Sequence, residues 1–154
     1  MCSSDLAKSP FTVQVKQRQL EIVGELDLKR EIPQHPRGIA VNSNGLIAVA
    51  DRERHCVLIF DKEGHFVRKF GCNGKNPGQL NIPSGVTYLN DDEILVADQL
   101  NHRIQQFNVQ TGNFVKSFGK KGTGEGEFQN PESVCVDDEG RVVVADCRDR
   151  KSVV

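Results

Sequence analysis

Three aspartates recur at a nearly constant interval and are the first candidates for chemistry. Asp51, Asp98 and Asp146 each close the same Val-Ala-Asp triplet, with steps of 47 and 48 residues. A carboxylate can serve as a general acid or base, but a catalytic centre needs a unique arrangement, and these residues repeat. A carboxylate directly after a strand can instead accept backbone N–H groups of the following turn. The repetition therefore predicts a structural role for all three.

Two histidines follow these aspartates at equivalent places, which raises the question of a metal. His55 and His102 would need three or four converging nitrogen or sulfur ligands for zinc, and no such spacing occurs. The alternative is an imidazole hydrogen-bonded to a neighbouring backbone carbonyl or carboxylate. The five cysteines form no CxxC pair and are expected to be free thiols. No metal and no cofactor is expected, and no triad, P-loop or HExxH motif indicates an enzyme.

Four arginines form the other group with binding chemistry. Arg37, Arg52, Arg54 and Arg103 fall in predicted loops of the first two thirds of the chain, whereas Asp137-Asp138-Glu139 makes the last third acidic. Such charges can be an ordinary solvated surface. The functional interpretation is a face on which planar guanidinium groups hold RNA phosphates and loop bases. Scarce loop aromatics and the absence of tryptophan weaken a base-stacking interpretation.

An internal repeat explains the spacing of these residues. The segments 36–41, 83–88 and 131–136 align through Pro36, Pro83 and Pro131, again with steps of 47 and 48 residues, and two of them share a glycine at Gly38 and Gly85. Within the first unit, short apolar runs at 38–41, 46–50, 56–60 and 66–70 alternate with Gly, Asn and Asp turns. Four short strands in a period of about 40–50 residues are typical of a propeller blade. The first two strands are expected to be buried on both faces, and the alternating fourth strand to be partly exposed.

The repeat resembles the NHL repeat. Residues 98–107 (Asp-Gln-Leu-Asn-His-Arg-Ile-Gln-Gln-Phe) are similar to its signature segment, with Pro-x-Gly-Val before it and Phe-Gly-x-x-Gly after it. Residues 51–60 keep the pattern but depart from Asn-His-Arg at Arg54 and Cys56, and the third unit stops just past Asp146. The resemblance implies an all-β fold: a partial, open NHL β-propeller with about two and a half four-stranded blades. The repeats are assigned to 18–148, as units at about 24–71, 72–119 and an incomplete 120–148.

The flanking segments are expected to have other origins. Residues 7–17 resemble the last strand of a filamin-type immunoglobulin domain. Such a domain precedes the propeller in some tripartite-motif (TRIM-NHL) proteins. Residues 20–23 are expected to close the ring by joining its last blade. Residues 1–6 and 149–154 can be encoded by an inverted DNA repeat that resembles sequencing-adapter DNA. Both ends are therefore predicted to be non-native tails. A partial ring with unpaired edges is expected to be marginally stable.

The resemblance implies a non-catalytic binding platform from a cytoplasmic protein. A TRIM-like parent would be a RING-type E3 ubiquitin ligase, and a propeller face would recruit an RNA hairpin or a protein partner. Two alternatives stay open: a protein scaffold without RNA contact, and a metal-dependent enzyme like the α-amidating lyase, which also uses an NHL-like propeller. Neither a membrane nor a small-molecule substrate is expected as partner. The candidate binding residues are Arg37, Arg52, Arg54, His55, Gln99, Asn101, His102 and Arg103.

Overall fold

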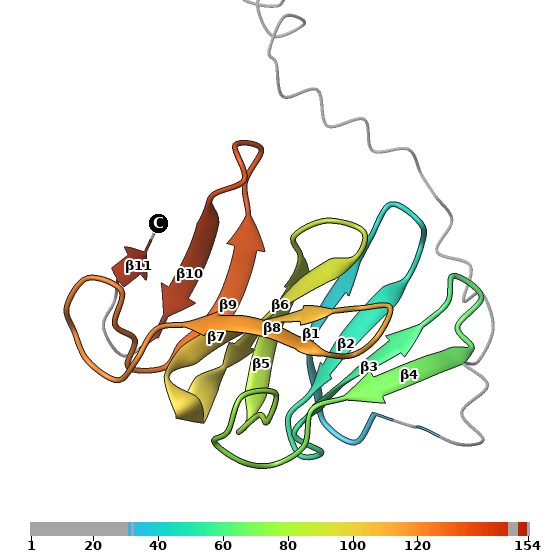
Figure 1. Ribbon diagram of the computed structural model, residues 1–154, viewed down its shortest axis with the longest axis horizontal. Coiled ribbons are helices and arrows are strands. Elements are labelled where there is room, and N and C mark those ends of the chain that lie inside the picture. Colours follow the sequence, from blue (N-terminus) through green and yellow to red (C-terminus); the bar gives the residue numbers. More distant parts are fainter. Residues whose placement is uncertain (1–30, 32, 148–150, 154) are drawn as a thin grey trace, which may run out of the picture.

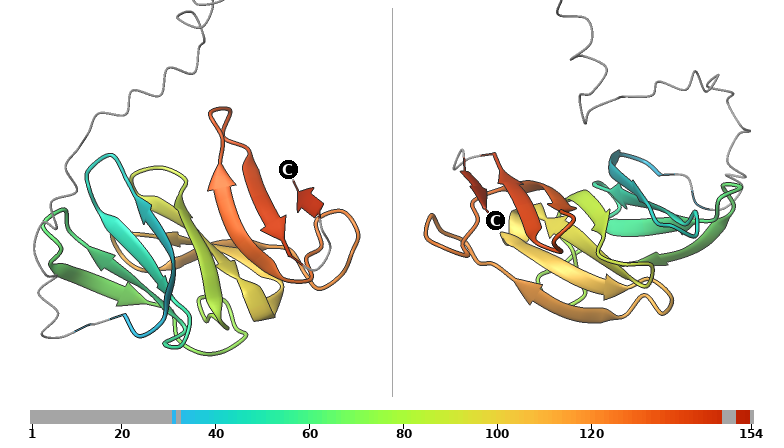
Figure 2. Two further views of the ribbon diagram at one scale, coloured as in Figure 1. Left: turned by 180° about the vertical axis from the view of Figure 1, so that it is seen from behind. Right: turned by 90° about the horizontal axis from the view of Figure 1, so that it is seen from above.

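The computed structural model shows three antiparallel sheets that lie side by side around a common axis (Figures 1 and 2). It describes residue 31, residues 33–147 and the backbone of residues 151–153. The described residues include one helical turn, the 3₁₀ helix η2 (Gln99–Asn101). The expected all-β propeller architecture is therefore confirmed. The expected filamin-type strand at 7–17 and the closing strand at 20–23 lie outside the described residues.

Each sheet is one blade, and its strands follow the chain from the axis outward. Blade 1 has the order β1 (Pro36–Val41), β2 (Ile47–Asp51), β3 (Cys56–Phe60) and β4 (Phe66–Phe70). Blade 2 repeats it with β5 (Pro83–Tyr88), β6 (Glu93–Asp98), β7 (Arg103–Asn108) and β8 (Phe114–Phe118). Blade 3 contains β9 (Pro131–Val136), β10 (Val142–Asp146) and β11 (Lys151–Val153). Every innermost strand begins at the predicted proline and every second strand ends at the predicted aspartate.

Blade 3 has one strand more than the sequence indicated. The third unit was expected to end just past Asp146, yet Lys151–Val153 pairs antiparallel with β10. Strand pairing uses backbone N–H and C=O groups, which every residue except proline provides, so the free edge of β10 can accept a segment with no repeat signature.

Among the described residues, two hydrophobic clusters lie between blades, and a third, formed by Val49, Cys56, Leu58 and Phe60, lies on the other side of blade 1. One cluster joins blade 1, through small residues such as Ala48 and Ala50, to larger residues of blade 2 such as Ile94 and Phe107. A second cluster joins blade 2, through Leu95, Ala97 and Ile104, to Val134 and Val144 of blade 3. Each blade therefore turns one side toward the following blade and the other toward the preceding one; we call these its forward side and its rear side.

Strand β1 differs from the expectation that inner strands are buried on both faces. Its side chains Ile39 and Val41 are 69% and 60% exposed, whereas Val86, the equivalent of Ile39 in β5, is 6% exposed. The reason is that β5 lies between β1 and β9, while among the described strands β1 has an inner-strand neighbour on its forward side alone. The outer strand β4 agrees with the prediction, because exposed and less exposed side chains alternate along most of it.

Glycine at the third position of the inner strands allows blades to approach at the axis. A Cβ atom at Gly38 would lie 2.4 Å from the carbonyl oxygen of Ser84, and one at Gly85 would lie 2.8 Å from the carbonyl oxygen of Glu132. Both obstacles are backbone atoms of the next inner strand, which cannot rotate away.

Replacing Gly85 by alanine is expected to destabilise the chain by about 1–3 kcal/mol, because the added methyl group forces β5 away from β9. Urea unfolding at fixed protein concentration measures this change. Gly124→Ala is the matched control, since its new Cβ would meet only the end of the Glu127 side chain, at 3.1 Å. Equal losses for the two variants would contradict the close-approach explanation.

Candidate binding face

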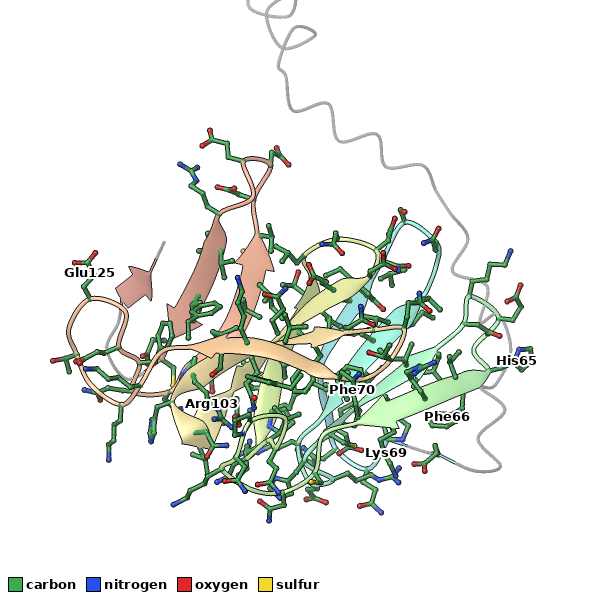
Figure 3. The ribbon with its side chains drawn as sticks, in the orientation of Figure 1. His65, Phe66, Lys69, Phe70, Arg103 and Glu125 are labelled. Carbon is green, nitrogen blue, oxygen red and sulfur yellow. The ribbon has the colours of Figure 1, made fainter. Side chains whose placement is uncertain are left out.

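The strand topology gives the propeller segment two faces that differ in their loops. The turns within β1–β2, β3–β4, β5–β6, β7–β8 and β9–β10 form one face, which we call the hairpin face. The β2–β3 and β6–β7 turns and the long segments that lead into β1, β5 and β9 form the opposite face, which we call the connector face. All eight candidate binding residues lie on the connector face or at the strand ends beside it. In Figure 3, Arg103 and Lys69 lie toward this face and His65 toward the other.

The three repeated aspartates hold the connectors to the blades. Asp51, Asp98 and Asp146 are at most 4% exposed. Each accepts a hydrogen bond from the backbone N–H that lies 17 residues upstream, on Gln34, Asn81 and Gln129 respectively. The partner common to all three aspartates therefore lies upstream, whereas the prediction placed it in the following turn; that turn also contributes a bond, from the backbone N–H of Arg54 to Asp51 at 3.3 Å. The carboxylate faces the segment entering its own blade, which lies beside the end of the second strand in space.

Asp98 is the centre of a larger polar network. Besides Asn81 N, its carboxylate accepts hydrogen bonds from Asn101 Nδ2 at 2.9 Å, Arg103 Nε at 2.8 Å and Gln105 Nε2 at 2.9 Å. The same three side chains also bond the connector at residues 74–79. The Arg103 side chain is 14% exposed and forms an ion pair with Asp98. Asn101 and Arg103 are therefore engaged in holding the connector between blades 1 and 2.

The two histidines link neighbouring blades instead of converging on one point. Both have a left-handed backbone, with φ of 51° at His55 and 56° at His102. His55 Nδ1 accepts a hydrogen bond from the backbone N–H of Ile82 at 3.0 Å, and His102 Nδ1 donates to the carbonyl oxygen of Gln129 at 2.6 Å. Each imidazole thus contacts the connector that enters the next blade, at a different seam.

Two further candidate residues also contact partners within the chain. Arg54 forms an ion pair with Glu31, which also pairs with Lys69 at 3.1 Å. The hydrogen bond from Lys69 and the pairing with Arg54 lower the pKa of Glu31 below its ordinary value. Gln99 is 5% exposed and donates to the Glu132 carboxylate at 3.2 Å.

Arg37 and Arg52 remain available on the connector face. Among the described residues, neither guanidinium group forms an ion pair or a side-chain hydrogen bond. Arg52 lies at the rim of a hollow of about 440 Å³ at the seam between blades 1 and 2, lined by His35, Arg52, Glu53, His55 and Ile82. Arg37 lies at a hollow of about 270 Å³ along the inner strands, which includes Ser84 and Glu132 at the equivalent positions of the other blades.

Acidic and basic residues are distributed differently between the two faces of the propeller segment, more than between its blades. The sequence indicated a basic first repeat and an acidic third, but Arg52 and Asp138 lie on opposite faces of the propeller. The hairpin face carries the acidic residues Asp61, Glu63, Asp91, Asp92, Asp137, Asp138 and Glu139 against Lys62 and Arg141. Apart from the Asp98–Arg103 pair, the connector face carries Arg37, Arg52, Arg54, Lys69, Lys75, Lys120 and Lys121 against Glu31, Glu53, Glu125, Glu127 and Glu132. The face with the free arginines is thus the one with the greater share of cations.

No metal or redox centre is evident in the part of the chain that the structure describes. It contains no group of three His, Cys, Asp or Glu side chains that could hold a metal ion. Cys56, Cys72, Cys135 and Cys147 are free, and burial raises the pKa of Cys56 to about 11. Over the same residues, no helix is long and apolar enough to span a bilayer.

The fold and the repeated aspartates define the class of protein: a β-propeller segment whose blades are held together through their connectors. Residues 34–60 match the family model of the NHL repeat, and residues 79–154 match the model of a 6-bladed beta-propeller. The chain therefore carries an NHL repeat at residues 34–60 within a β-propeller segment.

Parts of this chain are similar to animal proteins. The chain is 43% identical over 75 residues to Protein brain tumor of Drosophila melanogaster and 49% identical over 51 residues to RING finger protein nhl-1 of Caenorhabditis elegans. It is 44% identical over 43 residues to the E3 ubiquitin-protein ligase TRIM32 of Mus musculus. These matches cover 47%, 33% and 28% of this chain, and 7%, 5% and 7% of the respective relatives.

Solved structures share the fold at low identity. A structural genomics protein of unknown function from Bacteroides thetaiotaomicron has a TM-score of 0.66 and 16% identity, over 85% of this chain and 38% of that one. A catalytically inactive virginiamycin B lyase from Staphylococcus aureus has a TM-score of 0.59 and 16% identity, over 80% and 38%. At such identity the likeness concerns the fold alone.

Proposed function

We propose that this chain is a non-catalytic binding platform whose connector face binds structured RNA through Arg37 and Arg52. The observation that carries the proposal is the difference between these two arginines and the other candidates. Arg54, Arg103, Asn101 and Gln99 are engaged in contacts within the chain, whereas Arg37 and Arg52 lie free at two hollows of the same face. A guanidinium group can hold a phosphate with two parallel hydrogen bonds.

The rest of the site supports binding rather than catalysis. The three buried carboxylates that could act as acids or bases accept backbone hydrogen bonds from the connectors, and Asp98 also accepts from three side chains. Arg52 follows the structural Asp51, and its equivalents are Gln99 and Cys147, so the scaffold does not require a cation at this position. Because the fold does not require a cation there, the guanidinium group of Arg52 is available to bind a ligand.

Charge reversal of the two arginines is expected to weaken RNA binding strongly. The variant Arg37→Glu with Arg52→Glu should lower the affinity of the chain for an RNA hairpin by about tenfold or more and reduce the salt dependence of log K by about one per lost phosphate contact. Fluorescence anisotropy over a series of salt concentrations measures both quantities.

The matched control reverses two cations on the opposite face, Lys62→Glu with Arg141→Glu. This variant has the same change in net charge and is expected to bind RNA like the unmodified chain. If both double variants bind equally, the connector face is not the RNA site. If the unmodified chain binds a protein partner but no RNA, the scaffold interpretation replaces this proposal.

We further propose that the parent protein is a cytoplasmic RING-type ubiquitin ligase. Support comes from two relatives, one named a RING finger protein and the other an E3 ubiquitin-protein ligase. The chain spans less than a tenth of these relatives, so the proposal concerns sequence beyond this segment. A full-length transcript without a RING-encoding region would contradict it.

A further inference from the structure

We propose that the peptide group between Asn81 and Ile82 is a pH-sensitive switch, which protonation of His55 turns over at the seam between blades 1 and 2. The inference goes beyond the proposed function, because it concerns a conformational change inside the segment and holds whether or not RNA binds. It starts from a difference between three connectors that otherwise repeat.

Two of the three connectors hold the residue before the inner-strand proline in the same way. His35 and Asn130 each donate their backbone N–H to the aspartate of their own blade, at 3.2 and 2.8 Å. Their carbonyl oxygens accept the backbone N–H of the residue after that aspartate, Arg52 or Cys147, at 3.0 and 3.3 Å. These two bonds define one arrangement of the connector, which blades 1 and 3 share.

Blade 2 departs from this arrangement at the equivalent residue, Ile82. Its backbone N–H donates to Nδ1 of His55 at 3.0 Å, across the seam, rather than to Asp98 of its own blade. The carbonyl oxygen that accepts a backbone N–H is here that of Asn81, one residue earlier, and the donor is Leu100 at 3.1 Å. The bonds on both sides of the Asn81–Ile82 peptide therefore differ from those of the other two blades.

The two equivalent histidines show that this peptide is reversed. His55 accepts from the N–H of the Asn81–Ile82 peptide, whereas His102 donates to the carbonyl oxygen of the Gln129–Asn130 peptide, at 2.6 Å. The two peptides hold the same place in their connectors, and the two imidazoles the same place in their turns. The chain thus contains both orientations of one peptide group, each matched to an imidazole with the opposite hydrogen-bonding role.

The reversed orientation depends on its partners, because it places Ile82 in a left-handed backbone conformation with a φ of 56°. A side chain branched at Cβ disfavours this conformation, which persists where surrounding contacts hold it. The acceptor on His55 is one such contact. Asp98 is the other, because side chains occupy its oxygens where the remaining aspartates bind the backbone N–H before the proline.

Protonation of His55 removes the acceptor that the reversed peptide requires. Histidine side chains change charge between about pH 5 and 8, and the protonated ring donates from both nitrogens. A donor on Nδ1 then opposes the N–H of Ile82. The contact of His102 shows what a donating imidazole binds at this place, a carbonyl oxygen of the connector. We therefore expect the Asn81 carbonyl oxygen to turn toward His55 as the pH falls, and Ile82 to return to a negative φ.

The switch lies in the wall of the hollow at which Arg52 is found. His35, Arg52 and Glu53 line this hollow together with His55 and Ile82. Other charged or titratable residues on the elements around His55 are Asp51, Arg54, Cys72, Lys75, Asp98 and Arg103. Carboxylate, guanidinium and ammonium groups of proteins ordinarily keep their charge between about pH 5 and 7.5. The second imidazole, on His35, is therefore the group from which His55 must be distinguished.

The test is a series of NMR spectra of the isotopically labelled 154-residue chain between about pH 7.5 and 5. A positive φ brings the N–H and Hα protons of a residue close together, so Ile82 should give a strong intraresidue NOE at the upper pH. This NOE is expected to be lost in step with the protonation of His55, followed through its ring nitrogen shifts. Asn130, the equivalent residue of blade 3, is the internal control and should keep a weak NOE throughout.

Two variants identify the group that titrates. Asparagine tolerates a left-handed backbone and can accept a hydrogen bond at every pH, so His55→Asn should retain the strong Ile82 NOE down to the lowest pH. His35→Asn is the matched control and should leave the pH response unchanged. Four results would overturn the proposal: an Ile82 NOE that is constant while His55 protonates, an unchanged response in His55→Asn, a response abolished by His35→Asn, or unfolding of the whole segment over the same pH range.

Discussion

Replacing Asp98 by alanine is expected to lower the free energy of unfolding by about 3–5 kcal/mol, because it leaves the largely buried Arg103 cation without its partner. The carboxylate is fully buried and accepts hydrogen bonds from Asn81, Asn101, Arg103 and Gln105. Truncation removes all of these bonds at once and leaves the largely buried donors without their acceptor. Urea unfolding at fixed protein concentration measures the loss.

The control for Asp98 is an aspartate of the same charge in a solvated turn. Asp138 lies exposed in the β9–β10 hairpin, so Asp138→Ala should change the unfolding free energy by no more than about 0.5 kcal/mol. Asp98→Asn separates charge from hydrogen bonding, since the amide retains one acceptor but cannot form the ion pair. A loss at Asp98 as small as that at Asp138 would mean that the network does not hold the connector.

Replacing Phe107 by alanine is expected to destabilise the chain by a similar amount, about 3–5 kcal/mol, through a cavity between blades 1 and 2. Phe107 is 1% exposed, and its ring centroid lies 4.9 Å from that of Phe70 and 6.2 Å from that of Phe114. It therefore joins an outer strand of one blade to the next blade. The lost apolar contacts cannot be regained, because strands on both sides fix the surrounding backbone.

The matched control for the Phe107 variant is Phe118→Ala. Phe118 occupies in blade 2 the place of Phe70 in blade 1, yet it is 38% exposed where Phe70 is 6% exposed. Its removal should therefore destabilise the chain by about 1 kcal/mol or less. Thermal unfolding of the two variants checks the ranking. A larger loss at Phe118 than at Phe107 would show that the interface between blades 1 and 2 is not the stable part of the segment.

The sequence predicts the strands of each blade because the residues that recur with the repeat mark strand ends through local interactions. Pro36, Pro83 and Pro131 begin inner strands, and the aspartate after each Val-Ala pair ends a second strand. These features depend on neighbours within a few residues, so one sequence shows them. The repetition also predicts a structural role for the aspartates, and in the structure each accepts a backbone hydrogen bond from the segment that enters its own blade.

What the sequence could not predict depends on partners far apart along the chain. The hydrogen bond from Asn81 to Asp98 spans 17 residues, and the contact from His55 to Ile82 spans 27. Nothing local distinguishes a bound Arg103 from a free Arg52. One signal was present: Gln105 interrupts an apolar strand where blade 1 has Leu58, and a polar residue in a buried strand requires a partner.

The constant 17-residue spacing of the aspartate bonds has a consequence for how such proteins diversify. The carboxylate fixes the main chain, and the next side chain is free to change: Arg52, Gln99 and Cys147 occupy the same place on identical frames. Substitutions there are expected to change the surface chemistry at little cost in folding. The residue after the aspartate in one blade can thus change while the equivalent residues of the other blades stay the same.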